Sequence, residues 1–78
     1  RALRRILAQN NWTGAQKQWL RRIAKQIKRN VVVDRQSLDE PPFRHTGGFR
    51  RLDRVFDGQL DHVLRAMHEE IWRDEEAA

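Results

Sequence analysis

The three histidines are the side chains of this 78-residue chain that could most readily bind a metal ion or transfer a proton. His45 lies in a turn-forming stretch, whereas His62 and His68 are six residues apart on a predicted helix, about 120° from each other around its axis. Two imidazoles placed in this way cannot clamp one ion, and Glu69-Glu70 does not complete an HExxH pattern. We therefore expect exposed or partly packed histidines rather than a metal site.

The acids and hydroxyls do not form a catalytic arrangement either. Asp39-Glu40 and Glu69-Glu70 are neighbours in sequence, so their side chains point in different directions rather than across one scissile bond, and a solvated face explains them. Thr13, Ser37 and Thr46 could supply a nucleophilic hydroxyl, but none of them lies in a nucleophile-elbow motif. We predict no catalytic residue, cofactor-binding residue or metal ligand in this chain.

Thr46-Gly47-Gly48 precedes a predicted helix and could present backbone N–H groups to a phosphate, with Arg44, Arg50 and Arg51 nearby. The pair of glycines lacks the GxxxxGK[ST] or GxGxxG context of known phosphate loops. Glycine in front of a helix more often permits a sharp chain entry, and this structural interpretation is favoured.

The stretch QKQWLRRIAKQIKRN, residues 16–30, carries six Lys or Arg side chains and no acid. The whole chain has a net charge of +5, but residues 1–33 hold nine cationic residues without an acid, and residues 34–78 hold seven Arg against eleven acids. The basic stretch could neutralise DNA phosphates, with an affinity that falls with salt, or it could face the acidic half of its own domain or solvent. Because no helix-turn-helix spacing accompanies it, independent DNA recognition is the alternative rather than the leading hypothesis.

The three tryptophans suit either a thin core or an interface. Trp19 lies on the apolar stripe of its predicted helix and is expected in the core. Trp12 stands just before a helix start, where it could form a hydrophobic staple, and Trp72 falls outside the apolar arc of the last helix. The predicted partner or DNA contacts are Trp12, Arg21, Arg22, Lys25, Lys28, Arg29 and Trp72.

Apolar periodicity predicts that helices position these side chains. Leu3, Ile6 and Leu7 have helical spacing, and we interpret residues 1–11 as the end of a helix that enters from upstream. Thr13 and Gln16 form a capping-box signature that opens a second helix ending at Asn30. Its predicted apolar face contains Ala15, Gln16, Trp19, Leu20, Ile23 and Ile27.

The second half of the chain predicts an elbow and two further helices. Val31 to Val33 reads as an extended connector, Asp34 can cap a brief turn, Pro41-Pro42 stops any helix, and Phe43 is an anchor. The helical stripes are Phe49, Leu52, Val55 and Phe56, and then Leu60, Val63, Leu64, Met67 and Ile71. The pairs Asp61 to Arg65 and Glu69 to Arg73 have the favourable i, i+4 polarity.

These elements predict an all-α fold, a small compact bundle of three to four helices with a Pro- and Gly-containing elbow. The domain is expected over residues 12–73, followed by a frayed acidic tail, residues 74–78. Because there is no Cys, no leader peptide and no apolar run longer than Val31 to Val33, we expect a soluble cytoplasmic protein without a membrane anchor. The chain begins Arg1-Ala2-Leu3 and is expected to be a piece of a longer one.

Residues 12–72 resemble the C-terminal helical domain of the R (restriction, motor) subunit of type I restriction endonucleases. The resemblance is carried by Gln16 with Trp19-Leu20, by the elbow from Leu38 to Pro42-Phe43, by Gly47-Gly48, and by Phe56 ahead of the last helix, whereas residues 1–11 carry none of it. It implies that this segment is not itself an enzyme but belongs to an ATP-dependent site-specific deoxyribonuclease.

In that family the nuclease and the ATP-driven translocase lie upstream, so the resemblance implies that ATP and Mg²⁺ bind elsewhere in the parent chain. It also implies an assembly role, with the methyltransferase (modification) subunits and the neighbouring helicase domains as partners. Duplex DNA, bound without sequence preference, is a further expected ligand, and a free-standing DNA-binding module is the alternative.

Overall fold

The computed structural model describes residues 2–9 and 11–77, with side chains described as far as Arg73. The described part contains four α-helices and no β-strand. The helices are α1 (Ala2–Gln9), α2 (Gly14–Lys28), α3 (Gly48–Val55) and α4 (Leu60–Ala77), with short 3₁₀ turns η1 (Ser37–Asp39) and η2 (Arg44–Thr46) between α2 and α3. The predicted small all-α bundle is confirmed.

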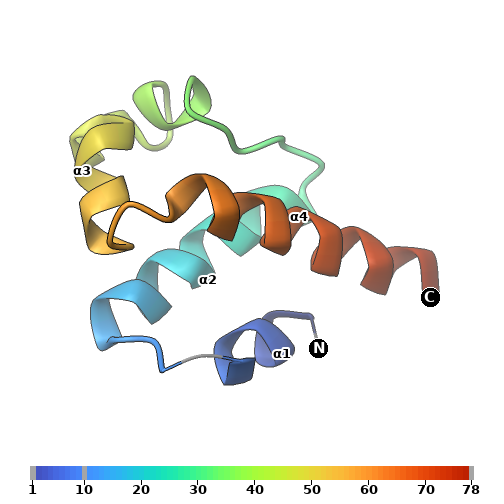
Figure 1. Cartoon of the computed structure of the whole chain (residues 1–78). Coiled ribbons are helices and arrows are strands. Elements are labelled where there is room, and N and C mark those ends of the chain that lie inside the picture. Colours follow the sequence, from blue (N-terminus) through green and yellow to red (C-terminus); the bar gives the residue numbers. More distant parts are fainter. Residues whose placement is uncertain (1, 10, 78) are drawn as a thin grey trace.

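The helices α1, α2 and α4 pack against one another, while α3 packs with η1, η2 and the start of α4 at one end of the molecule (Figure 1). The shared core is aliphatic with two buried phenylalanines, Phe43 and Phe56. Ala2 and Ile6 of α1 are buried in this same core, beside residues of all the other α-helices. The division of the chain into an upstream helix, a domain beginning at Trp12 and an acidic tail stays a prediction.

The start of α2 is fixed by the predicted capping box. Thr13 Oγ1 accepts a hydrogen bond from the Gln16 N–H at 3.1 Å, and Gln16 Oε1 accepts one from the Thr13 N–H at 2.8 Å. Gln16 is buried, and its Nε2 also donates to the Val55 carbonyl at 2.9 Å. One side chain therefore both opens α2 and ties it to the C-terminal end of α3.

The inward face of α2 is rotated relative to the prediction. Leu20, Ile23 and Ile27 are buried as expected, but Ala15 is exposed and Trp19 is only half-buried at the edge of the core. Ala24 is buried in their place. The cause is tertiary packing: α1 and α4 both pack on α2, whereas Trp19 lies at the edge of the core beside residues of η2 and α3.

The elbow between α2 and α3 follows the predicted pattern. In the connector Val33 is buried, while Val31 and Val32 are exposed. Asp34 Oδ1 accepts a hydrogen bond at 2.9 Å from the N–H of Ser37, the first residue of η1. Phe43 is buried as the expected anchor, next to the cis peptide bond between Pro41 and Pro42.

The last helix buries the whole predicted stripe: Leu60, Val63, Leu64, Met67 and Ile71. Neither predicted i, i+4 pair is in direct contact among the described side chains, although the charge of Arg65 helps to lower the pKa of Asp61. Asp61 pairs directly with Arg35 at 2.6 Å, and Glu70 pairs with Arg5 at 3.2 Å and with Arg73 at 3.5 Å. Within the described ranges, no helix is both long and apolar enough to cross a membrane.

Candidate functional site

The predicted cationic contacts lie together on one side of α2 and just after it. This basic face consists of Arg21, Arg22, Lys25, Lys28 and Arg29, and all five side chains are exposed. The carboxylates that form ion pairs among the described side chains are Asp61 and Glu70, and neither pairs with the basic face. In this part of the chain the acidic half therefore does not neutralise the cations of α2 through direct pairs.

One member of the basic face is held in place by neighbours. The Arg22 guanidinium lies 4.5 Å from the centre of the Trp19 ring, a cation–π contact. Its Nη2 lies 3.3 Å from His45 Nε2, which accepts the hydrogen bond because a guanidinium can only donate. Trp19, predicted as a core residue, thus has a second role as the platform for Arg22.

A second surface lies where the connector, residues 31–33, passes α4. Val32 is 58% exposed and Trp72 is 45% exposed, and both line a shallow hollow of about 440 Å³ between the two segments. We call these two residues, with Leu64 and His68 at the base of the hollow, the Val32–Trp72 patch. Trp72 was predicted to lie outside the core, whereas Val32 was missed because a valine in a connector gives no signal of its surroundings.

His68 forms the base of this patch and is buried, which differs from the expected exposed or partly packed histidine. Its Nδ1 lies 2.7 Å from the Leu64 carbonyl, an acceptor, so Nδ1 carries the hydrogen. Its Nε2 accepts a hydrogen bond from the Val33 N–H at 3.1 Å. The Trp72 ring packs edge-on against the imidazole, with 5.2 Å between ring centres. The histidine thus joins α4 to the connector and supports Trp72.

The rim of the patch is charged. Asp34, Asp61, Arg65 and Glu69 surround the hollow. The hydrogen bond from Arg35 and the charge of that guanidinium hold the pKa of Asp61 below its usual value, and the same contact raises the pKa of Arg35. An apolar centre with a charged rim is the usual arrangement of protein–protein contact sites.

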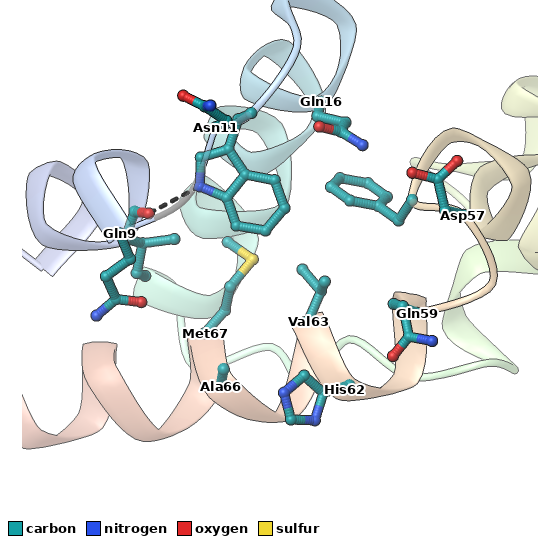
Figure 2. A pocket seen from close by; sticks show the side chains of 12 residues that line it. Gln9, Asn11, Gln16, Asp57, Gln59, His62, Val63, Ala66 and Met67 are labelled. Atoms are coloured by element: carbon teal, nitrogen blue, oxygen red, sulfur yellow. Dashed lines mark hydrogen bonds between the residues drawn. The ribbon is translucent and has the colours of Figure 1, made fainter.

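Trp12, the other predicted aromatic contact, is used inside the molecule. Its Nε1–H donates to the Ile6 carbonyl at 2.8 Å, near the end of α1, and its ring lies edge-on to Phe56 with 6.0 Å between centres. Beside it is a pocket of about 370 Å³, with Val63 and Met67 on the floor and Gln59 and His62 at the rim in Figure 2. Trp12 therefore connects α1 to Phe56 at the end of α3, and a role as a partner contact stays a prediction.

The Gly47-Gly48 turn has the structural role that the sequence favoured. Both glycines have positive φ, 93° and 81°, and a Cβ at Gly48 would collide with the Asp39 carboxylate. That carboxylate accepts a hydrogen bond from the Phe49 N–H at 3.3 Å. An acidic side chain of the protein thus takes the place at the start of α3 where a phosphate would bind.

The histidines lie on separate parts of the molecule: His45 is exposed on η2, His62 is exposed on α4, and His68 is buried beneath Trp72. Among the side chains described, those of residues 2–9 and 11–73, no three His, Asp or Glu come together in a way that could hold a metal ion. The arrangement offers two surfaces for binding, the basic face and the Val32–Trp72 patch.

The chain matches a protein family and a curated relative. A profile of the family described as EcoEI R protein C-terminal matches residues 1–72, so the match includes α1 as well as the segment from Trp12 onward. The chain is 38% identical over 71 residues to the type I restriction enzyme EcoKI endonuclease subunit of Escherichia coli strain K12. That alignment covers 91% of this chain and 6% of the length of the curated relative. No solved structure matches the chain significantly.

Proposed function

Because the chain belongs to the EcoEI R protein C-terminal family, the C-terminal region of type I restriction enzyme R subunits, we propose that it is a non-catalytic assembly domain of such a subunit. In this role it docks the ATP-dependent translocase and nuclease onto the methyltransferase core of a DNA restriction-modification complex. The neighbouring helicase domains of the same subunit are its second partner.

The observation that carries this proposal is the Val32–Trp72 patch. A tryptophan and a valine stand 45% and 58% exposed, from two different elements, around one hollow with a charged rim. Tryptophan is enriched among the residues that dominate binding energy at protein interfaces. The imidazole of His68 packs against the Trp72 ring and restricts it, which lowers the entropy lost when a partner covers it.

The proposal assigns the catalytic chemistry to the rest of the R subunit. ATP and Mg²⁺ would bind there, and the intact protein would be an ATP-dependent site-specific deoxyribonuclease of the cytoplasm. This division agrees with the small share of the curated relative, 6% of its length, that the chain spans.

The alternative function is a free-standing module that binds duplex DNA. The basic face favours it, since five exposed cations could neutralise phosphates without help from other domains. This alternative predicts that the isolated chain shifts a DNA duplex at low salt. Failure to shift any duplex at low salt would reject it.

The assembly role is tested by deletion. The intact protein that contains this domain, and a version that lacks residues 1–78, are each offered to the purified modification subunits in a pull-down. We expect the intact protein to be retained and the deleted version to be lost, while its ATP hydrolysis in isolation persists as the control for folding. Undiminished retention of the deleted version would reject the proposal.

A further inference from the structure

We propose that the basic face of α2 is a contact surface for the phosphate backbone of duplex DNA, used without sequence preference inside the assembled enzyme. This surface is separate from the Val32–Trp72 patch, and its ligand differs from the protein partner proposed for that patch. The choice of duplex DNA among polyanions rests on the proposed function, whereas the choice of a polyanion rests on the charges and packing of α2.

The first support is the concentration of charge. Arg21 to Arg29 covers roughly 12 Å of helix length, and the five cations lie within about 120° of its circumference. Like charges at i, i+4, such as Arg21 with Lys25, destabilise a helix, and no described carboxylate pairs with them. The described carboxylates therefore do not offset this repulsion, whereas a bound polyanion would relieve it.

The helix dipole accounts for only part of the cluster. Lys28 and Arg29 lie at the C-terminal end of α2, where a cation is favourable. That effect falls off within the last turn of a helix. Arg21 and Arg22 lie further back, so another reason is needed for their position.

The composition of the surface favours phosphate over an acidic protein. Between Arg21 and Arg29 the side chains that are not cationic are Ile23, Ala24, Gln26 and Ile27, and all four are buried or half-buried. The fully exposed residues of this stretch are therefore all cationic. Protein interfaces are enriched in Arg but depleted of Lys, and they usually have an apolar or aromatic centre, which this stretch lacks, while a phosphate backbone needs only donors and positive charge.

Arg22 adds a preorganised element to this surface. Its guanidinium already lies over Trp19 and beside His45, so less side-chain freedom is lost when it meets a phosphate. Guanidinium groups also match phosphate oxygens with two parallel hydrogen bonds. We therefore expect Arg22 to contact a phosphate at one end of the basic face.

The test compares two triple variants of the intact protein that remove the same charge. The first is Arg21→Gln, Lys25→Gln, Lys28→Gln on the basic face; the second is Arg44→Gln, Arg50→Gln, Arg54→Gln, three exposed cations of η2 and α3. Binding to a duplex without a recognition sequence is measured over a salt series. Each phosphate contact contributes about 0.9 to the log-log salt slope, so the first variant should lose about 2 to 3 units and the second none.

Equal slopes for the first variant and the unmodified protein would overturn the inference, as would an equal fall in the second variant. If the first variant keeps its slope but no longer binds the modification subunits, the basic face is a protein contact and the inference is wrong. Failure of the docking role has a different signature, because deletion of residues 1–78 would then leave assembly intact. In that case, a loss of salt slope confined to the first variant would still support the phosphate contact.

Discussion

His68 shows what a single side chain contributes to this structure. Its ring donates to the Leu64 carbonyl, accepts from the Val33 N–H and packs against Trp72. The sequence placed His68 correctly on the last helix and correctly apart from His62. It could not reveal the acceptor role, because Val33 reaches the imidazole only after the connector has turned back along α4.

We predict that His68→Ala lowers the free energy of unfolding by about 2 to 3 kcal/mol, since it leaves the Val33 N–H without a partner and removes a buried ring. Chemical denaturation of the 78-residue chain measures this change. His62→Ala is the matched control, because it removes the same group from an exposed position of the same helix, and it should cost less than about 0.5 kcal/mol. Equal losses for the two variants would contradict the assignment.

Asp61 gives a prediction for acid pH. Its hydrogen bond with Arg35 keeps the pKa of Asp61 lower in the folded chain than in the unfolded chain. The stabilisation is therefore present above the unfolded pKa, about 3.9, and is lost as pH falls through the folded value.

Thermal midpoints of the unmodified chain and Asp61→Asn should differ by a small constant amount near neutral pH. They should converge as pH falls from about 3.9 through the lowered pKa of folded Asp61, because the carboxyl group is then protonated in both states of the unmodified chain. A gap that stays constant down to about pH 2 would show that the Arg35 contact does not set it.

At the scale of elements, the sequence predicts where α2 begins better than which of its faces is buried. Thr13 and Gln16 predict the start of α2 from local chemistry alone, and the structure has both hydrogen bonds. The burial of Ala24 in place of the predicted Ala15 depends on where the neighbouring helices pack on α2. That placement is set by tertiary packing, which a helical wheel does not contain.

The turn into α3 provides a paired glycine test. Gly48→Ala should destabilise the fold by about 1 to 3 kcal/mol, because φ is 81° and the new Cβ would displace the Asp39 carboxylate. Gly14→Ala, at the first position of α2 with open space around it, should be neutral or stabilise by up to about 1 kcal/mol. Denaturant midpoints measure both. A neutral Gly48→Ala would show that the turn does not need glycine.

At the scale of the whole molecule, the apolar stripes of the sequence predict nearly all of the core. Leu20, Ile23 and Ile27 point inward, and the cations of α2 remain outside. The Val32–Trp72 patch could be predicted only in part, because it joins a connector to a helix that starts 28 residues later. Contacts of that kind depend on the path of the chain through the elbow. The local sequence predicts only where the helices before and after the elbow end and begin.

The Val32–Trp72 patch is proposed to dock the subunit onto the modification subunits, and the dissociation constant of that complex measures this contact. The constant is measured for the intact protein and for Val32→Ser, Trp72→Ala and the control His62→Ala. We predict at least a fivefold weakening for Val32→Ser, about thirtyfold or more for Trp72→Ala, and less than twofold for the control. Unchanged affinity in both patch variants would rule out the Val32–Trp72 patch as the docking surface.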